Sequence, residues 1–182
     1  MRKIIFAINT TINGNVDHTV GISDDELHNF YTDLLNSVDV VLMGRITYQL
    51  MESFWPVAHK APQSTQSIMR FADKYNSIKK IIFSETLKEV KWQNSQLADQ
   101  NLQEIISELK NQDGKNISAG SLSIALQLLK LDLIDEFWIA VHPFVAEKGP
   151  RLFEGIDVIK KLKLVDSKTL SSGVVFHHYL NI

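Results

Sequence analysis

The chain has 182 residues, of which 45% are hydrophobic and 22% are charged, and its formal net charge is −2. A chain of this length buries one sizeable core and is short for two, so we expect a single domain over residues 1–182. The nearly balanced charge argues against proteins that find nucleic acid or anionic membranes through bulk electrostatics. The sequence has no cysteine, which excludes disulfides, thiolate metal sites and cysteine nucleophiles and is typical of a cytoplasmic protein.

The first half of the chain alternates buried apolar runs with amphipathic segments. Its opening run stops at Ile8, which is too short for a signal peptide or a membrane span and reads as a strand. The residues Ser23–Glu26, "SDDE", fit a capping box at the start of a helix. The periodicity predicts strands at about 3–8, 38–43 and 79–84 and helices at about 24–37, 45–52 and 68–75.

The second half continues this alternation and then changes. A helix is expected over about 102–109, with Gly114 as the residue that ends it, followed by a short strand at 116–119. That strand turns directly into a helix at 122–130, and an apolar strand follows within 134–145. After a loop at 147–155, two alternating runs around Ser171–Gly173 predict a hairpin.

Alternation of strands and helices indicates right-handed crossovers and a largely parallel sheet with helices on both faces. The C-terminal hairpin adds antiparallel strands to that sheet. The expected fold class is therefore a three-layer α/β domain with a mostly parallel central sheet and an antiparallel C-terminal hairpin.

Three junctions at the ends of strands carry residues suited to phosphate. Ligands of such sheets bind beyond the carboxyl ends of the strands, where helix N-termini present free amides. Glycine or hydroxyl residues stand there at Met43–Thr47, Ser84–Thr86 and Ala119–Leu122, and Arg45 adds a charge that can pair with phosphate in a bidentate manner. The residue types also allow a simpler interpretation, in which the glycines permit tight turns, the hydroxyls cap helices and the arginine is solvated.

The order of these motifs resembles a known family. The segments are "KIIFAINTTING", "VVLMGRITYQLM", "IIFSETL", "ISAGSLSIALQLLKLDLIDEFWIAVHPFV", "GPRLF" and "SSGVVFHHYL". Together they resemble the dihydrofolate reductase fold and, more closely, the C-terminal reductase domain of the riboflavin-biosynthesis deaminase-reductase and its stand-alone bacterial relatives. The resemblance covers essentially the whole chain.

The resemblance implies that NADPH binds across the edge where the strands end. It places Gly44, Arg45 and Thr47 at the pyrophosphate and the 2′-phosphate region, with Ser84 and Thr86 beside the latter. It also places the backbone of Ala119, Gly120, Ser121 and Leu122 at the pyrophosphate, Ala7 at the nicotinamide carboxamide, and Gly14 in a loop over the nicotinamide. Where dihydrofolate reductases typically have a Gly-Gly turn with a cis peptide, this chain has Ala119-Gly120.

A reductase of this kind needs a proton as well as a hydride. Related enzymes use a carboxylate in the first helix, where Asp24 shares the face of Leu27 and Tyr31 and is the candidate catalytic residue. His28 lies one turn further along that face and is an alternative. A third interpretation is that acidic residues in a first turn only complement the helix dipole.

Several other suggestive residues have structural explanations. His177 and His178 are adjacent on a predicted strand, so they face opposite sides and cannot chelate a metal together, and we expect no metal site. Phe54 and Trp55 could line a pocket for a flat heterocycle or pack in the core. Trp138 is expected in the core or at an interface.

These observations favour an NADPH-dependent reductase of a small pteridine- or pyrimidine-like substrate, of the dihydrofolate reductase or 5-amino-6-(5-phosphoribosylamino)uracil reductase type. The alternative is a non-catalytic nucleotide-binding or sensor domain on the same fold. We expect a small heterocyclic substrate as partner and neither nucleic acid nor membrane. The resemblance also implies a homodimer paired through a sheet edge, supplied by Ile134–Val145 or by the C-terminal strands.

Overall fold

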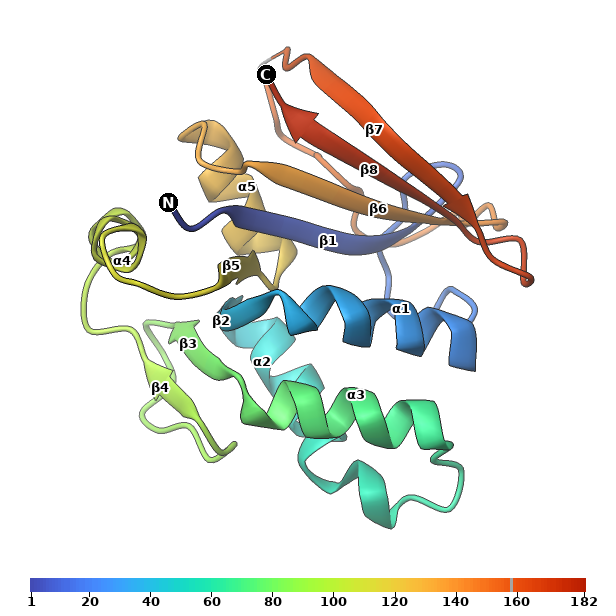
Figure 1. Ribbon diagram of the computed structural model, residues 1–182, viewed down its shortest axis with the longest axis horizontal. Coiled ribbons are helices and arrows are strands. Elements are labelled where there is room, and N and C mark those ends of the chain that lie inside the picture. Colours follow the sequence, from blue (N-terminus) through green and yellow to red (C-terminus); the bar gives the residue numbers. More distant parts are fainter. Residues whose placement is uncertain (158) are drawn as a thin grey trace.

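The computed structural model describes residues 1–157 and 159–182. The described residues form one eight-stranded sheet with helices on both faces (Figure 1). In chain order the elements are β1 (Ile4–Thr11), α1 (Asp25–Asn36), β2 (Val38–Gly44), α2 (Arg45–Glu52), the 3-10 helix η1 (Trp55–Lys60), α3 (Gln66–Ser77), β3 (Lys79–Phe83), β4 (Ser95–Leu97), α4 (Leu102–Lys110), β5 (Asn116–Ala119), α5 (Leu122–Lys130), β6 (Glu136–His142), β7 (Leu162–Thr169) and β8 (Val175–Asn181).

The strand order is β4-β3-β2-β5-β1-β6-β8-β7. All pairs from β4 to β6 are parallel, and β8 pairs antiparallel with both β6 and β7. The tight turn between β7 and β8 contains Gly173 at a φ of 85°, a conformation that glycine adopts without a steric penalty. The expected mostly parallel sheet with an antiparallel C-terminal hairpin is confirmed.

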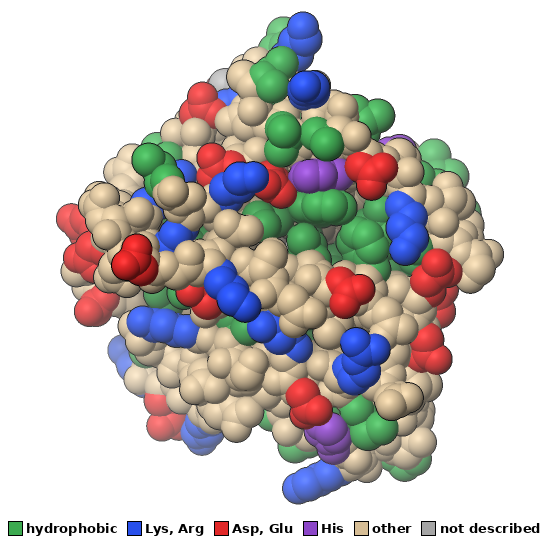
Figure 2. Space-filling model, in the orientation of Figure 1, with side chains coloured by type: hydrophobic (Ala, Val, Ile, Leu, Met, Phe, Trp, Pro, Cys, Tyr) green, Lys and Arg blue, Asp and Glu red, His purple; other side chains and the backbone are tan. Residues whose placement is uncertain are grey.

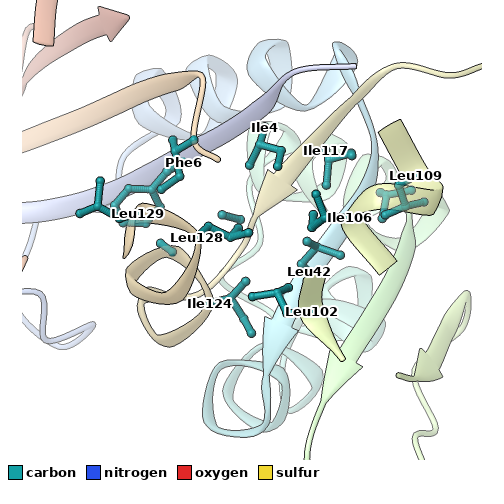
Figure 3. Close-up of a cluster of buried hydrophobic side chains, with 14 of the residues drawn as sticks. Ile4, Phe6, Leu42, Leu102, Ile106, Leu109, Ile117, Ile124, Leu128 and Leu129 are labelled. Atoms are coloured by element: carbon teal, nitrogen blue, oxygen red, sulfur yellow. The ribbon is translucent and has the colours of Figure 1, made fainter. Parts of the chain in front are cut away.

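Two apolar clusters hold the helices onto opposite faces of the sheet. On one face, shown in Figure 3, side chains of α4 and α5 pack against β1, β2 and β5, with Phe6, Leu42 and Leu128 at most 1% exposed. On the other face, α1, α2 and α3 pack against β2 and β3. Figure 1 shows α1 and α3 side by side across this second face. Both faces of the parallel strands are therefore buried, as their continuous apolar runs predict.

Two predicted helix boundaries are wrong in detail. The N-cap of α1 is Asp24, whose Oδ1 accepts a 2.8 Å hydrogen bond from Leu27 N, so Ser23 and Glu26 form no capping box. Glu26 instead accepts hydrogen bonds from the amide and the hydroxyl of Ser171. Gly114 lies beyond the C-cap Asn111 of α4 and does not end that helix.

Two strands also differ from expectation. The short strand β4 was not predicted, because its three residues are polar or only half-buried and show no apolar run. It joins the sheet through backbone pairing with β3. The segment Ile134–Val145 does not supply a sheet edge, since β6 is paired on one side with β1 and on the other with β8.

A lysine is fully buried in the sheet, although lysine side chains are usually exposed. The side chain of Lys80 on β3 is 0% exposed, and its Nζ donates to the carbonyl oxygens of Tyr75 at 3.0 Å and Ile78 at 2.8 Å. The same Nζ lies 4.5 Å from the centroid of the Trp92 ring. Burial lowers the pKa of Lys80 to about 8.

Among the described residues, no helix combines the length and the apolar character that crossing a membrane requires.

Candidate active site

The three junctions singled out in the sequence meet at the carboxyl edge of the sheet, the edge where the parallel strands end. They follow β2, β3 and β5, and β2 lies between the other two strands. Ser121, which precedes α5, accepts a 3.0 Å hydrogen bond through its Oγ from the amide of Gly44, which precedes α2. The starts of two helices that are far apart in the sequence are thus joined directly.

The two glycines at this edge, Gly44 and Gly120, are closely surrounded by other atoms. A Cβ on Gly44 would lie 2.6 Å from Ser123 Oγ, and one on Gly120 would collide with Val41 Cγ1 and lie 3.2 Å from Leu42 O. The amide of Gly120 donates to Leu42 O at 2.8 Å. The peptide bonds of the described chain are trans, that between Ala119 and Gly120 included. The close approach of β2 and β5 therefore leaves no room for a side chain at Gly120, whereas at Gly44 the nearest atom is a serine hydroxyl, which can rotate.

A groove of about 320 Å³ opens at this edge. Its lining residues are Gly44, Arg45, Ile46, Phe83, Ser84, Glu85, Thr86, Ser123, Ile124 and Gln127. The structure therefore brings four of the predicted positions, Gly44, Arg45, Ser84 and Thr86, into one groove. The other predicted positions are not in its lining: Ala7, Gly14, Thr47, Ala119, Gly120, Ser121 and Leu122. The residues that sequence reasoning missed are Glu85, between two predicted positions, and Ser123 and Gln127, which the turns of α5 bring to the same side.

The charges of the groove are one cation and one anion. The exposed guanidinium of Arg45 donates from Nη1 to Gln49 Oε1 at 3.0 Å, a neutral partner that leaves its charge uncompensated. Glu85 supplies the carboxylate. Ser84 Oγ accepts from the amides of Thr86 and Leu87 and so orders the turn after β3. A ligand phosphate would meet Arg45 and hydroxyl groups here.

The two helices that begin at this edge differ from the other α-helices of the described chain. α1, α3 and α4 have side-chain caps from Asp24, Thr65 and Asn101. The N-caps of α2 and α5, Gly44 and Ser121, make no capping hydrogen bond to their own helices. The first amides of α2 and α5 therefore lack the side-chain acceptor that α1, α3 and α4 have, and the N-terminal ends of both helix dipoles favour an anion.

A second group of polar residues lies at the end of β1. The loop that follows β1 contains Gly14 at a φ of 81°, and Gly14 O accepts a 2.7 Å hydrogen bond from Leu152 N. Asn13 bonds through its side chain to both the amide and the carbonyl of Ala146. The loop is thus tied to the segment after β6, and Ala7 lies on the strand that leads into it.

Asp24 and His28, the two candidate proton donors, lie at the start of α1, Asp24 as its N-cap and His28 in its first turn. Asp24 uses one carboxylate oxygen as the helix cap. His28 is half-buried with its ring 6.1 Å from the ring centroids of both Trp55 and Phe71, and within the described chain its Nδ1 has no hydrogen-bond partner. Burial lowers the pKa of His28, while the charges of Asp25 and Asp24 act in the opposite direction.

A third titratable residue, His142 at the end of β6, was not predicted as a site residue. Its side chain is 1% exposed, and it contacts the loop before α1 and the end of β1. No motif in the sequence marks this histidine, because its contacts come from segments more than 100 residues away. Burial lowers its pKa, and the charge of Asp24 acts in the opposite direction.

The structure describes no group of three or more His, Asp or Glu side chains that could hold a metal ion in the parts of the chain it covers. His178 stacks on Trp138 with ring centroids 3.8 Å apart, whereas His177 contacts Ser167 and lines an apolar pocket on the other side of the sheet. The two adjacent histidines therefore face opposite sides of β8, as expected.

Trp55 packs against Phe71 at the end of α2, with ring centroids 4.5 Å apart.

Comparison with known proteins agrees with this architecture. The RibD C-terminal domain family model matches residues 2–176. Protein YyaP of Bacillus subtilis (strain 168) is 32% identical over 180 residues, covering 96% of this chain and 92% of that protein. A pyrimidine reductase-like protein from Corynebacterium diphtheriae is 15% identical, with a TM-score of 0.70 and coverage of 100% of this chain and 92% of that one.

The dihydrofolate reductase of Enterococcus faecalis, solved in complex with NADP(H), is 10% identical, with a TM-score of 0.65 over 98% of this chain and 96% of that one. At this level of identity the likeness concerns the fold alone. The family match and the relative at 32% identity extend over nearly the whole sequence. The chain belongs to the RibD C-terminal domain family and has a fold like that of dihydrofolate reductase.

Proposed function

We propose that this protein is an NADPH-dependent reductase that transfers a hydride to a small pteridine- or pyrimidine-like substrate. The observation that carries the proposal is the pair of helix starts at the carboxyl edge. α2 and α5 begin side by side, joined by the Gly44–Ser121 hydrogen bond, and both lack the side-chain caps of the other described α-helices. Two such N-termini next to Arg45 form a site for a pyrophosphate and a further phosphate.

The residues present fit a dinucleotide phosphate. Gly44 and Gly120 leave the backbone bare where β2 and β5 end, and the groove beside them contains a cation and several hydroxyl groups. In the proposed complex Arg45 and Thr47 contact the phosphates, and Ser84 and Thr86 lie beside the 2′-phosphate. The backbone of Ala119–Leu122 contacts the pyrophosphate. At the other end of the cofactor, Ala7 contacts the nicotinamide carboxamide and Gly14 lies in the loop over the nicotinamide. When bound, NADPH supplies the hydride.

Reduction of a C=N bond or a sugar carbonyl also requires a proton, and we propose Asp24 as its source. Asp24 has one carboxylate oxygen free of the helix cap. His28 remains the alternative, because its Nδ1 is unpartnered among the described residues. A histidine whose pKa is lowered by burial is neutral at pH 7, which makes it a poorer donor than its usual pKa would imply.

The proposal is tested by measuring NADPH binding and NADPH consumption separately. Binding is followed by the fluorescence of the reduced nicotinamide, and consumption by its absorbance after addition of dihydrofolate or of 5-amino-6-(5-phosphoribosylamino)uracil. Arg45→Ala is expected to weaken NADPH binding about tenfold or more, since a charge-assisted hydrogen bond contributes about 1.5–3 kcal/mol. Arg70→Ala, at an exposed arginine of α3 that bonds to Asn29, is the matched control.

Unchanged NADPH affinity in Arg45→Ala would contradict the assignment of the phosphate site. Tight NADPH binding without consumption, with either substrate, would support the non-catalytic nucleotide-binding alternative instead.

We also propose that the protein pairs with a second copy through β7. This eight-residue strand is one of the two outer strands of the sheet, and its Leu164 and Val165 are 52% and 50% exposed. Unpaired edge strands with exposed apolar side chains are prone to associate. Light scattering coupled to size-exclusion chromatography should show a dimer that Leu164→Lys together with Val165→Lys converts to monomer, and a monomeric wild-type protein would contradict the pairing.

A further inference from the structure

The side chain of Asn9 is exposed near the end of β1, although polar contacts hold one side of it. Its Oδ1 lies 2.9 Å from the hydroxyl of Tyr31 on α1 and 3.1 Å from Nε2 of His142 on β6. Asn9 shares a face of β1 with Ala7, because strand side chains alternate and Phe6 and Ile8 belong to the cluster on the other face. Asn9 therefore lies two residues beyond the position proposed to contact the nicotinamide.

The orientation of this amide follows from the tautomer of His142. The backbone amide of Ile22 donates to His142 Nδ1 at 3.0 Å, and a backbone N–H can only be a donor. Nδ1 must then carry a lone pair, so the proton of the neutral ring is on Nε2. Nε2–H in turn donates to the Asn9 side chain, which must present its oxygen to the ring. The NH₂ group of Asn9 is left pointing away from both partners.

The partners of Asn9 are themselves held in place. His142 is buried, and a Cβ on the neighbouring Gly21 would lie 3.3 Å from its Nδ1, so that the loop passes directly over the ring. Burial lowers the pKa of His142 and raises that of Tyr31, so both side chains are neutral at pH 7. Within the described chain, no group accepts a hydrogen bond from the Asn9 NH₂.

The surface beside Asn9 suits a flat ring. Figure 2 shows the face that carries α1, which is hollowed between α1 and the C-terminal strands, with hydrophobic side chains in the hollow. Trp138 is the register partner of Ala7 on β6, stacks on His178 and lies 5.7 Å from the Phe30 ring. An aromatic surface bordered by a few directed polar groups is typical of a site for a heterocycle.

We propose that Asn9 is a specificity-determining residue that presents N–H donors to the substrate and selects a heterocycle with an exocyclic carbonyl oxygen at that position. The inference rests on the proposed function and names the hydrogen-bonding pattern of its substrate. A ring with an amino group at the same position would place two donors against each other and leave both without an acceptor. Tyr31 and His142 act through Asn9 and are positioning residues.

The test compares two small probes that differ in this pattern. Uracil has exocyclic carbonyl oxygens, whereas 2,4-diaminopyrimidine has amino groups in the same places. Dissociation constants for both are measured by NMR titration of the ¹⁵N-labelled protein, free and with NADP⁺. The wild-type protein should prefer uracil by about tenfold, as expected when one net hydrogen bond is made with one probe and lost with the other.

Asn9→Asp replaces the donors by an acceptor while keeping the shape and the bonds from Tyr31 and His142. It should reverse the preference in favour of 2,4-diaminopyrimidine. Asn111→Asp adds the same charge at an exposed residue after α4, at the opposite edge of the sheet, and should leave the wild-type preference unchanged. An equal preference in Asn9→Asp and Asn111→Asp, or no binding of either probe to the wild-type protein at millimolar concentration, would overturn the inference.

The two proposals fail in different ways. If NADPH does not bind, the proposed function is wrong, and the preference of the free protein for either probe is still measured. If NADPH binds and is consumed but Asn9→Asp keeps the wild-type preference, the proposed function stands and the role of Asn9 is wrong.

Discussion

Ser121 Oγ accepts a 3.0 Å hydrogen bond from the amide of Gly44, and this contact joins the N-cap residues of α2 and α5 across the boundary between β2 and β5. A serine at an N-cap usually bonds to its own helix. Here it bonds to the neighbouring junction, so the first amides of α5 keep no side-chain acceptor. The contact both aligns the two helix starts and leaves them available to an anion.

Removing this contact should affect both stability and cofactor binding. Ser121 is 5% exposed, so Ser121→Ala leaves the Gly44 amide without its acceptor, at a cost of about 1–3 kcal/mol in the free energy of unfolding. We expect NADPH affinity to fall as well, because α2 and α5 lose their alignment. Urea denaturation and NADPH fluorescence titration measure the two effects. Ser77→Ala, which removes a hydroxyl bonded to Lys74 O near the end of α3, is the control. Full NADPH affinity in Ser121→Ala would contradict the role of the contact.

Substitutions of two neighbouring carboxylates test which residue donates the proton. Asp24→Asn retains an oxygen for the cap to Leu27 N and should fold normally. If Asp24 donates the proton, NADPH consumption falls by about 10²-fold or more while NADPH affinity is unchanged. Asp25→Asn, in the same helical turn, controls for the helix dipole and should keep most activity. Equal effects of the two substitutions would indicate that these carboxylates only complement the dipole of α1. Loss of activity in His28→Gln but not in Asp24→Asn would identify His28 as the proton donor.

Lys80 should stabilise the fold strongly despite its charge. Lys80→Met leaves the carbonyls of Tyr75 and Ile78 without this donor, and we expect a loss of about 2 kcal/mol or more in the free energy of unfolding. The exposed neighbour Lys79 is the control, and Lys79→Met should change the free energy of unfolding by less than about 0.5 kcal/mol. Similar values for the two variants would contradict a structural role of the buried lysine.

The same pair of variants predicts a pH dependence. The native pKa of Lys80 is about 8, below the usual value of 10.5, so between these two values the unfolded chain binds more protons than the folded one. Stability contributed by this group therefore rises as the pH increases from 8 towards 10.5. The difference in unfolding free energy between wild type and Lys80→Met should grow over this range, and a constant difference would contradict the lowered pKa.

Acid should destabilise the protein through His28 and His142. Burial lowers the pKa of both His28 and His142 below 6.5, so the unfolded chain binds more protons as the pH falls through that value. The stability of the folded state is then lost progressively below pH 6.5. Urea denaturation at pH 7.5 and 5.5 should show a smaller loss in His28→Leu than in wild type. His59→Leu, at an exposed histidine paired with Asp73, should not reduce the loss in this way.

The secondary structure was largely predictable because it depends on local patterns. The helix at Arg45–Glu52 was predicted with the bounds that the structure has, since an apolar strand, a glycine and an amphipathic run follow each other directly. The hairpin was predicted from alternation around Gly173. The strand β4 was missed because three residues contain no period, and backbone pairing with β3 alone defines it.

The cap of α1 illustrates a limit of local reasoning. Both Ser23 and Asp24 are residue types that cap helices well, and in the structure Asp24 is the cap. Glu26, which a capping box with Ser23 would have required, instead accepts a hydrogen bond from Ser171, 145 residues further along the chain. The edge assigned to Ile134–Val145 failed for a related reason. An apolar strand can be central or outer, and only the pairing of β6 with both β1 and β8 decides between them.

The amino-acid sequence by itself determined the order of strands and helices, the three junctions suited to phosphate, and the family resemblance, because these depend on residue types at short spacing. Only the tertiary structure decided that the β2 and β5 junctions touch, that Lys80 is buried, and that Asn9 turns its amide outward. Each of these depends on groups brought together from distant segments. The direction of the Asn9 side chain follows from a backbone amide at Ile22 acting through His142, a chain of hydrogen bonds that no local pattern records.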